Sequence, residues 1–432
     1  MSKQLYCGAA RVDITPAEEE LSGLFGLMGL GYAGIIDRLS TRVIAVQSGD
    51  DKALIVGFDL DKAPEPMTWL PELAEHTGIA EERILYFSTH TQSAPLTTIR
   101  PREHNRATPE QRESMNRYEA VLHDKLFACA DEALANLRPA RMGYSLSSSQ
   151  VSVNRNANFV YTDEKGEKYP FICEAMNWGA PVDRTLLTVR FEDLEGNPIA
   201  FFVNLPMHCC LMFMNNYDGE GRMGISGDIS GRISTLVEEK YPGSVAIWSS
   251  GAAGDVDPVL FNAVMYPDPK DGHYVKEVFE SWKTTEMLLR MIVGWHYKDV
   301  SEAIEAISCN QSEVAIRSAL EWSETPSNTE GEPYRIRMQA LQLGKVALVG
   351  IGGELYNSLG KVLKEASPAE ATAVINHNAS LIDDAGYILD DDAIFRASQN
   401  APIQHFIPGG KTRSKPGFVA ESIQNHIRHM LG

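Results

Sequence analysis

The hydrophobic residues of this chain fall into two kinds of segment: short β-branched runs of strand length and longer stretches with helical spacing. Residues 42–46 and 53–58 are two such runs joined by turn-forming residues at 48–51, which predicts a β-hairpin. The pattern then predicts a helix over 64–77 and a buried strand over 84–87. Because strand, helix and strand follow one another, we expect a layered α/β fold.

A long helix is predicted to begin at Thr108. Thr108, Pro109 and Glu110 supply an N-cap, a proline at the first helical position and an acidic first turn, and apolar residues recur at helical spacing as far as Leu134. The other predicted strands lie near 141–145, 185–191, 198–204, 244–248, 335–343, 346–351 and 372–376, and the other predicted helices near 230–240, 276–307, from 354 onward and 419–430.

The chain has no sequence feature that divides it into domains. It contains no Pro/Gly/Ser-rich linker, no internal repeat and no low-complexity segment. We therefore expect one large domain over residues 1–432, built as a mixed β-sheet layered with helices, rather than the two domains that its length alone would suggest.

The composition excludes several classes of function. A net charge of −19 argues against nucleic acid, which is bound by basic surfaces, and against stable association with anionic membranes. No apolar stretch reaches the roughly 18–20 residues that span a bilayer, and the N-terminal residues do not resemble a signal peptide. The six cysteines form no CxxC pair, as expected of reduced thiols. We expect a cytoplasmic protein that acts on a small molecule, and assembly into a homo-oligomer is left open.

Two histidines stand where apolar strands end. His90 closes the run that begins at Arg83, and His208 closes the run that begins at Ile199. Strands of an α/β sheet deliver functional side chains at their carboxyl ends, where ligands bind. A lone histidine in such a place is more often a hydrogen-bonded structural residue. The pair makes a metal site the better interpretation.

Glu354 adds a carboxylate at a third junction. It lies between a predicted strand and the first turn of a predicted helix, where the helix dipole also favours a glutamate. Two histidines and a glutamate with an open fourth position form a recurrent catalytic zinc arrangement. We therefore predict that His90, His208 and Glu354 bind Zn²⁺.

A series of short motifs follows in a fixed order along the chain. They are Arg11-Val12-Asp13-Ile14-Thr15-Pro16, Met28-Gly29-Leu30-Gly31-Tyr32, the segment 34–42, Ser88-Thr89-His90-Thr91, Val153-Asn154-Arg155, Met207-His208, Ser226-Gly227-Asp228, Gly254-Asp255-Val256-Asp257-Pro258 and Gly352-Gly353-Glu354. Together they resemble the catalytic domain of neutral/alkaline non-lysosomal ceramidases, zinc amidases that cut the N-acyl bond of ceramide. The resemblance implies the same α/β scaffold without the C-terminal β-sandwich domain, because the chain stops at Gly432.

The resemblance also implies particular site residues. The zinc ligands of the family fall on His90, His208 and Glu354, and the fourth ligand, a tyrosine, falls on Tyr387. The arginine that contacts substrate in the family falls on Arg155.

Two positions depart from the family pattern. Gln92 stands where ceramidases carry a second histidine, and a glutamine cannot shuttle a proton. Asp257 stands where they carry a serine, so Asp257 or the nearby Asp255 is a candidate replacement acid or base. With no evident amphipathic membrane-binding helix, these departures predict that the protein is not an efficient ceramidase.

These observations predict a zinc-dependent hydrolase that uses a metal-activated water on an amide (N-acyl) bond of a small, soluble, polar substrate. A metal-dependent carbohydrate-active enzyme (lactone or ester hydrolase, glycoside hydrolase, lyase or epimerase) is the main alternative. A zinc-binding protein without catalysis is a third, although structural zinc sites usually use four Cys or His ligands. A polar pocket would favour sugars, and an apolar tunnel would favour acyl chains.

Overall fold

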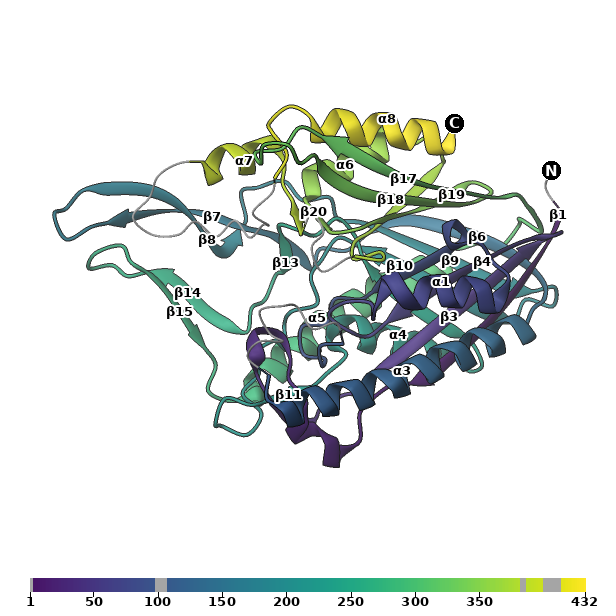
Figure 1. The fold of residues 1–432 in the computed structure, drawn as a ribbon, viewed down its shortest axis with the longest axis horizontal. Coiled ribbons are helices and arrows are strands. Elements are labelled where there is room, and N and C mark those ends of the chain that lie inside the picture. The colour runs from purple at the N-terminus through teal and green to yellow at the C-terminus, as the bar shows by residue number, and fades with distance from the viewer. Residues whose placement is uncertain (1–2, 98–106, 381–385, 399–412) are drawn as a thin grey trace.

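The computed structural model describes residues 3–97, 107–380, 386–398 and 413–432 (Figure 1). Its strands are β1 (Lys3–Asp13), β2 (Tyr32–Ile35), β3 (Ser40–Ser48), β4 (Asp51–Phe58), β5 (Ile84–Ser88), β6 (Arg138–Ser148), β7 (Ser152–Thr162), β8 (Lys168–Asn177), β9 (Thr185–Asp193), β10 (Pro198–Leu205), β11 (Met223–Ile225), β12 (Val245–Ser250), β13 (Val256–Pro258), β14 (Ala263–Pro267), β15 (Tyr274–Val278), β16 (Glu313–Val314), β17 (Ile316–Thr325), β18 (Tyr334–Leu343), β19 (Val346–Ile351), β20 (Glu354–Leu355), β21 (Ala371–Ile375) and β22 (Tyr387–Ile388). Its α-helices are α1 (Pro66–Thr77), α3 (Pro109–Ala135), α4 (Asp228–Lys240), α5 (Trp282–Glu305), α6 (Asn357–Ala366), α7 (Asp391–Ala397) and α8 (Val419–Leu431).

The largest sheet contains the predicted hairpin. Its strand order is β12-β10-β9-β6-β1-β3-β4-β5, with β16 paired to β1. β3 and β4 pair antiparallel from Thr41↔Phe58 to Ser48↔Asp51, which confirms the hairpin. β5 runs parallel to β4, and β12 runs parallel to β10, so the sheet is mixed as predicted. Almost every residue of β3 is buried, because both faces of the sheet are covered.

A second sheet of order β17-β18-β19-β21 packs against one face of the first. Ile44 and Phe202 from the large sheet share one buried cluster with Leu341, Leu348 and Ile375 from the small sheet. The pattern of apolar runs had predicted a single sheet layered with helices. The mixed α/β class is confirmed, and the structure adds a sheet-on-sheet core.

Helices cover both outer faces of the two sheets. α1 and α3 pack on β3, β4 and β5, and α4 and α5 pack on β10 and β12. On the opposite side α6 and α8 cover the small sheet, so that the layers run helix, sheet, sheet, helix (Figure 1). No helix within the described ranges is long and apolar enough to cross a membrane.

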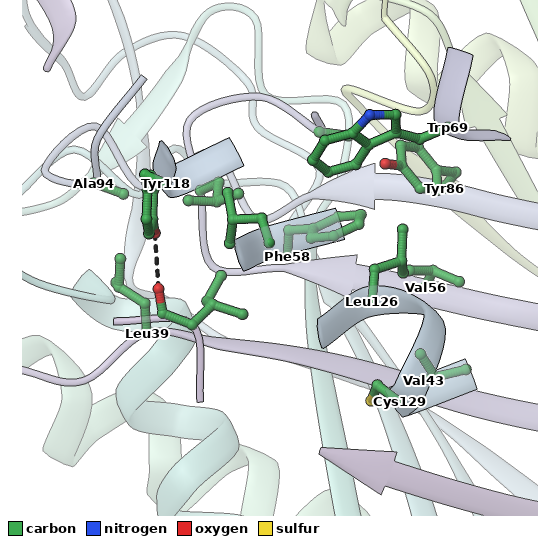
Figure 2. Packing of buried hydrophobic residues seen from close by; sticks show 14 of the residues in the cluster. Leu39, Val43, Val56, Phe58, Trp69, Tyr86, Ala94, Tyr118, Leu126 and Cys129 are labelled. Atoms are coloured by element: carbon green, nitrogen blue, oxygen red, sulfur yellow. Dashed lines mark hydrogen bonds between the residues drawn. The ribbon is translucent and has the colours of Figure 1, made fainter. Parts of the chain in front are cut away.

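The long helix α3 begins where the sequence predicts. The Thr108 hydroxyl accepts the Gln111 backbone N–H and the Gln111 side chain accepts the Thr108 N–H, which forms a capping box. Leu126 and Cys129 of this helix pack on Val43, Val56 and Phe58 of the sheet (Figure 2). The buried end of α3 is thereby tied to the large sheet.

The elements predicted from the sequence and those of the structure differ at three places. The predicted helix over 276–307 begins only at Trp282, because residues 274–278 pair with β14 as strand β15. Strands β7 and β8, which the sequence pattern did not predict, form a hairpin that projects from the body (Figure 1). Glu354 does not begin a helix: it lies on strand β20, paired in parallel with β22, and α6 begins at Asn357.

Replacing Phe202 by alanine should destabilise the protein by about 3–5 kcal/mol, because it empties a fully buried ring position between the two sheets. Urea denaturation of the purified variant measures this loss. Leu194→Ala is the matched control: Leu194 is half-exposed, so its loss should cost well under about 1 kcal/mol. Equal losses in the two variants would contradict a sheet-on-sheet core at this position.

Candidate metal centre

The carboxyl ends of strands from both sheets meet at one cluster of imidazole and carboxylate groups. His90 follows β5 and His208 follows β10, both in the large sheet. Glu354 follows β19 and His377 follows β21, both in the small sheet. All four residues are buried. The face-to-face packing of the two sheets is what brings them together.

His90 is held by its Nδ1 atom. This nitrogen lies 2.9 Å from the backbone oxygen of Asp61 and 3.1 Å from its Oδ1, so it carries the proton and donates it. The tautomer leaves a lone pair on Nε2, which lies 3.3 Å from the Gln92 side-chain nitrogen and 3.6 Å from Oε2 of Glu354. Gln92 is therefore a neighbour of the nitrogen that would bind a metal.

His208 is oriented in the same way. Its Nδ1 lies 3.1 Å from the Val256 carbonyl oxygen and 3.7 Å from Oδ1 of Asp257. Its Nε2 lies 3.0 Å from Oε2 of Glu354. A backbone carbonyl that fixes the second nitrogen of a histidine is the usual support of a metal-binding imidazole.

Glu354 is the common partner of both imidazoles. Its backbone N–H donates to the Gly386 carbonyl at 2.7 Å, which fixes the side chain at the junction of β20 and β22. Burial by itself would raise the pKa of Glu354, but the imidazoles of His90 and His208 hold that pKa well below its usual range. Burial would likewise lower the pKa of His90, but the carboxylates of Glu354 and Asp61 raise it. The cluster is built around a persistent negative charge.

Arg155 places a positive charge beside this cluster. Its Nη2 donates to the Tyr387 hydroxyl and to the Gly254 carbonyl, each at 2.9 Å, and its Nη1 lies 3.2 Å from Oδ1 of Asp257. The Arg155 side chain is buried, not a surface arginine. Tyr387 also faces His208, with nearly parallel rings whose centroids lie 6.3 Å apart. The structure thus brings Arg155, Asp257 and Tyr387 to the site.

Asp255 faces a different environment from Asp257. Its Oδ2 accepts from the Asn154 side chain at 2.7 Å, and its Oδ1 accepts from the Asn357 backbone N–H at 2.8 Å. Burial raises the pKa of Asp255 to about 6. It lines a cavity of about 730 Å³ that none of the three residues His90, His208 and Glu354 lines. Of the two candidate aspartates, only Asp257 contacts the imidazole and guanidinium groups.

His377 is a site residue that the sequence reasoning missed. Its ring stacks on that of His90 with centroids 3.8 Å apart, and donor atoms of His90, Glu354 and His377 all lie within 4.8 Å of one another. The signal was present in the sequence, because His377 comes directly after the strand predicted over 372–376, just as His90 and His208 end theirs.

The donor set fits a divalent cation. Two ligands of a tetrahedral zinc ion, each about 2.0–2.1 Å from the metal, stand roughly 3.3–3.4 Å apart. The distances of 3.0 and 3.6 Å from Oε2 of Glu354 to the two Nε2 atoms bracket this value. Both nitrogens direct lone pairs at a carboxylate oxygen, an arrangement that is repulsive unless a proton or a cation lies between them.

The fold is that of neutral ceramidases. The structure of neutral ceramidase from Pseudomonas aeruginosa superposes with a TM-score of 0.70 and 15% sequence identity, covering 99% of this chain and 74% of that one. A second structure, described as ceramidase complexed with C2, gives a TM-score of 0.69 and 15% identity, covering 99% and 75%. No family model and no curated protein sequence matches the chain. The resemblance in the motifs is thus confirmed at the level of the fold.

Asp257→Asn should destabilise the protein by about 3–5 kcal/mol, because it leaves the buried guanidinium of Arg155 without its carboxylate. Chemical denaturation measures the change. The control is Glu302→Gln, which breaks the exposed Lys298–Glu302 pair and should cost at most about 0.5 kcal/mol. A cost for Asp257→Asn no larger than that of the control would show that the buried pair does not hold Arg155.

Proposed function

We propose that the protein is a zinc-dependent hydrolase that cleaves an amide (N-acyl) bond of a small, soluble, polar substrate. The observation that carries the proposal is the convergence of two lone-pair nitrogens, from His90 and His208, on one oxygen of Glu354. Tyr387 is the proposed fourth ligand, since β22 sets it beside Glu354. The shared fold with two ceramidases supports hydrolysis of an amide bond.

Zinc, when bound, lowers the pKa of a coordinated water to about 7 and polarises a carbonyl group. The protein's own contribution begins with Arg155, whose buried guanidinium is the positive group available to an oxygen of the substrate. Asp257 and the Gly254 carbonyl fix its direction. Removing a preorganised donor of this kind typically costs about 10²–10³-fold in rate.

The two aspartates are assigned different roles. Asp257 positions Arg155 and backs the His208 ring, whereas Asp255 ties Asn154 to the start of α6 through Asn357. Proton transfer by either aspartate stays a prediction. Separate Asp255→Asn and Asp257→Asn variants, assayed on a substrate that the wild type turns over, test it.

A cavity of about 730 Å³ lies beside the segment that carries Arg155, although neither Arg155 nor any of the three residues His90, His208 and Glu354 lines it. Its lining includes the carboxamides of Asn154, Asn156 and Asn177 together with Tyr356 and Lys361. The lining also includes Ile172, Pro181 and Val182, so the cavity offers both polar and apolar contacts. The carboxamides in this lining favour the second candidate function, a metal-dependent enzyme acting on a carbohydrate lactone, ester or glycoside. A screen of the zinc-loaded protein against N-acyl amides, lactones and glycosides separates the two.

Zinc binding should be abolished in His208→Ala and in His90→Ala, because each removes a ligand with a fixed lone pair. Metal analysis after dialysis against trace zinc gives the stoichiometry. His123→Ala is the matched control, since His123 lies outside the cluster and pairs with Glu72. Full stoichiometry in both ligand variants would overturn the proposed centre.

Ceramide presented in detergent micelles should be turned over at least about 10²-fold more slowly than a small polar amide, because a chain of net charge −19 with no evident amphipathic membrane-binding helix has little means of drawing a lipid out of a micelle. Product release measured for both substrates under the same zinc loading gives the ratio. Ceramide turnover as fast as that of the best polar substrate would contradict the substrate class proposed here.

A further inference from the structure

Hydrogen bonds to several segments of the fold fix the position of His377. It lies in the turn Asn376-His377-Asn378 after β21, and its backbone N–H donates to the Gly353 carbonyl at 3.1 Å. The side chain of Asn376 accepts the Leu355 N–H at 3.2 Å, and that of Asn378 accepts the Tyr86 N–H at 3.0 Å. The turn is therefore tied both to the Glu354 segment and to β5, the strand that leads to His90.

The same turn holds His377 in a costly state. Its φ is 60°, in the left-handed region that a residue with a Cβ occupies only at a cost in conformational energy. Its ring is 1% exposed, and Nδ1 has no hydrogen-bond partner within the described residues. A buried polar atom without a partner adds a desolvation penalty to that cost. An imidazole that only filled space would be a poor choice here.

We infer that His377 is a further direct ligand of the cation, so that the centre contains three imidazoles in addition to Glu354 and the proposed ligand Tyr387. This inference rests on the metal centre of the proposed function, but not on the reaction. Its basis is the mutual reach of the donor atoms of His90, Glu354 and His377, all within 4.8 Å. His208 joins this group through Glu354, whose Oε2 lies 3.0 Å from the His208 Nε2. A cation bound by Nδ1 would give that nitrogen the polar partner that it lacks within the described residues.

The charges around the cluster agree with this assignment. Two buried carboxylates flank the imidazoles: Glu354 between the Nε2 atoms, and Asp61 behind His90. Their two negative charges balance a divalent cation when all three imidazoles are neutral, and a balanced set is what a buried site requires. Arg155 and Asp257 neutralise each other beside it.

The rings of His90 and His377 are stacked, with planes inclined by 18°. Two imidazoles that bind one ion present their edges to it, so ligation requires the His377 ring to turn about its side-chain bonds. His90 is fixed through Nδ1, whereas Nδ1 of His377 has no partner that would resist the rotation.

The wild-type protein loaded with Co²⁺ alone provides the first test. Each ligating histidine contributes one exchangeable, strongly shifted imidazole N–H resonance to the proton NMR spectrum of a Co²⁺ protein in water. We expect three such resonances. Two resonances, from His90 and His208 only, would overturn the assignment without any variant having to fold.

The second test measures Co²⁺ affinity by competition with a chelator in His377→Asn. Asparagine suits the left-handed backbone, so the turn is kept while the imidazole is removed. We expect affinity to fall by about 10²-fold or more, a changed visible absorption spectrum, and a smaller rise in Tm on adding Co²⁺. The Tm of the metal-free variant should not fall, because an unpartnered imidazole has been removed.

His123→Asn is the matched control and should bind Co²⁺ like the wild type. Wild-type affinity and spectrum in His377→Asn would overturn the inference. If His377→Asn binds Co²⁺ like the wild type while His90→Ala does not, only the inference about His377 fails. If His90→Ala binds Co²⁺ normally, the metal centre of the proposed function fails as well.

Discussion

The carboxylate of Glu354, buried between the imidazoles of His90 and His208, is the interaction on which the site depends. The two histidines follow strands of the large sheet, and the glutamate follows β19 of the small sheet on the short strand β20. Their meeting therefore requires that the two sheets first bury their shared apolar faces, where Ile44 and Leu348 lie in one cluster. The hydrophobic free energy of that interface holds the lone pairs of the two imidazoles close to the Glu354 carboxylate. That enforced proximity is what would attract a cation to the proposed centre.

Around this interaction the protein fixes orientation with groups that face away from solvent. Backbone oxygens of Asp61 and Val256 accept the Nδ1 protons of the two histidines, so each Nε2 is free to bind a metal. Asp257 connects His208 to Arg155, and Arg155 reaches the Tyr387 hydroxyl. Each of these contacts joins segments far apart in the chain. The geometry is a property of the assembled fold and not of any one loop.

Aspartates two residues apart in this region bind different partners, because their side chains point in different directions. Asp59 lies against Arg42 at 2.7 Å, and the same guanidinium also binds Glu238 at 2.8 Å, which makes Asp59 part of a buried structural network. Asp61, two residues later, faces His90. Asp257 on strand β13 and Asp255 directly before that strand also face different partners. Side chains two residues apart can face different partners where a strand ends, because the regular alternation stops there.

The sequence by itself determined the local elements and three of the four residues that converge in the cluster. The hairpin β3–β4, helix α3 with its capping box, and the strand ends that carry His90 and His208 are written in patterns only a few residues long. Glu354 was identified as a site residue but assigned to a helix, because a glutamate after Gly-Gly fits a helical first turn as well as a short strand. Only its pairing with β22, more than thirty residues away, decides between the two.

The tertiary structure alone decided how these elements meet. Strand pairing and sheet stacking join segments distant in sequence, and no local pattern specifies which apolar faces will cover one another. The sheet-on-sheet core, the burial of Arg155, the division between Asp255 and Asp257, and the place of His377 against His90 all follow from that packing. Short-range propensity thus set where each functional side chain leaves its strand. The mutual burial of the two sheets set which of those side chains share one site.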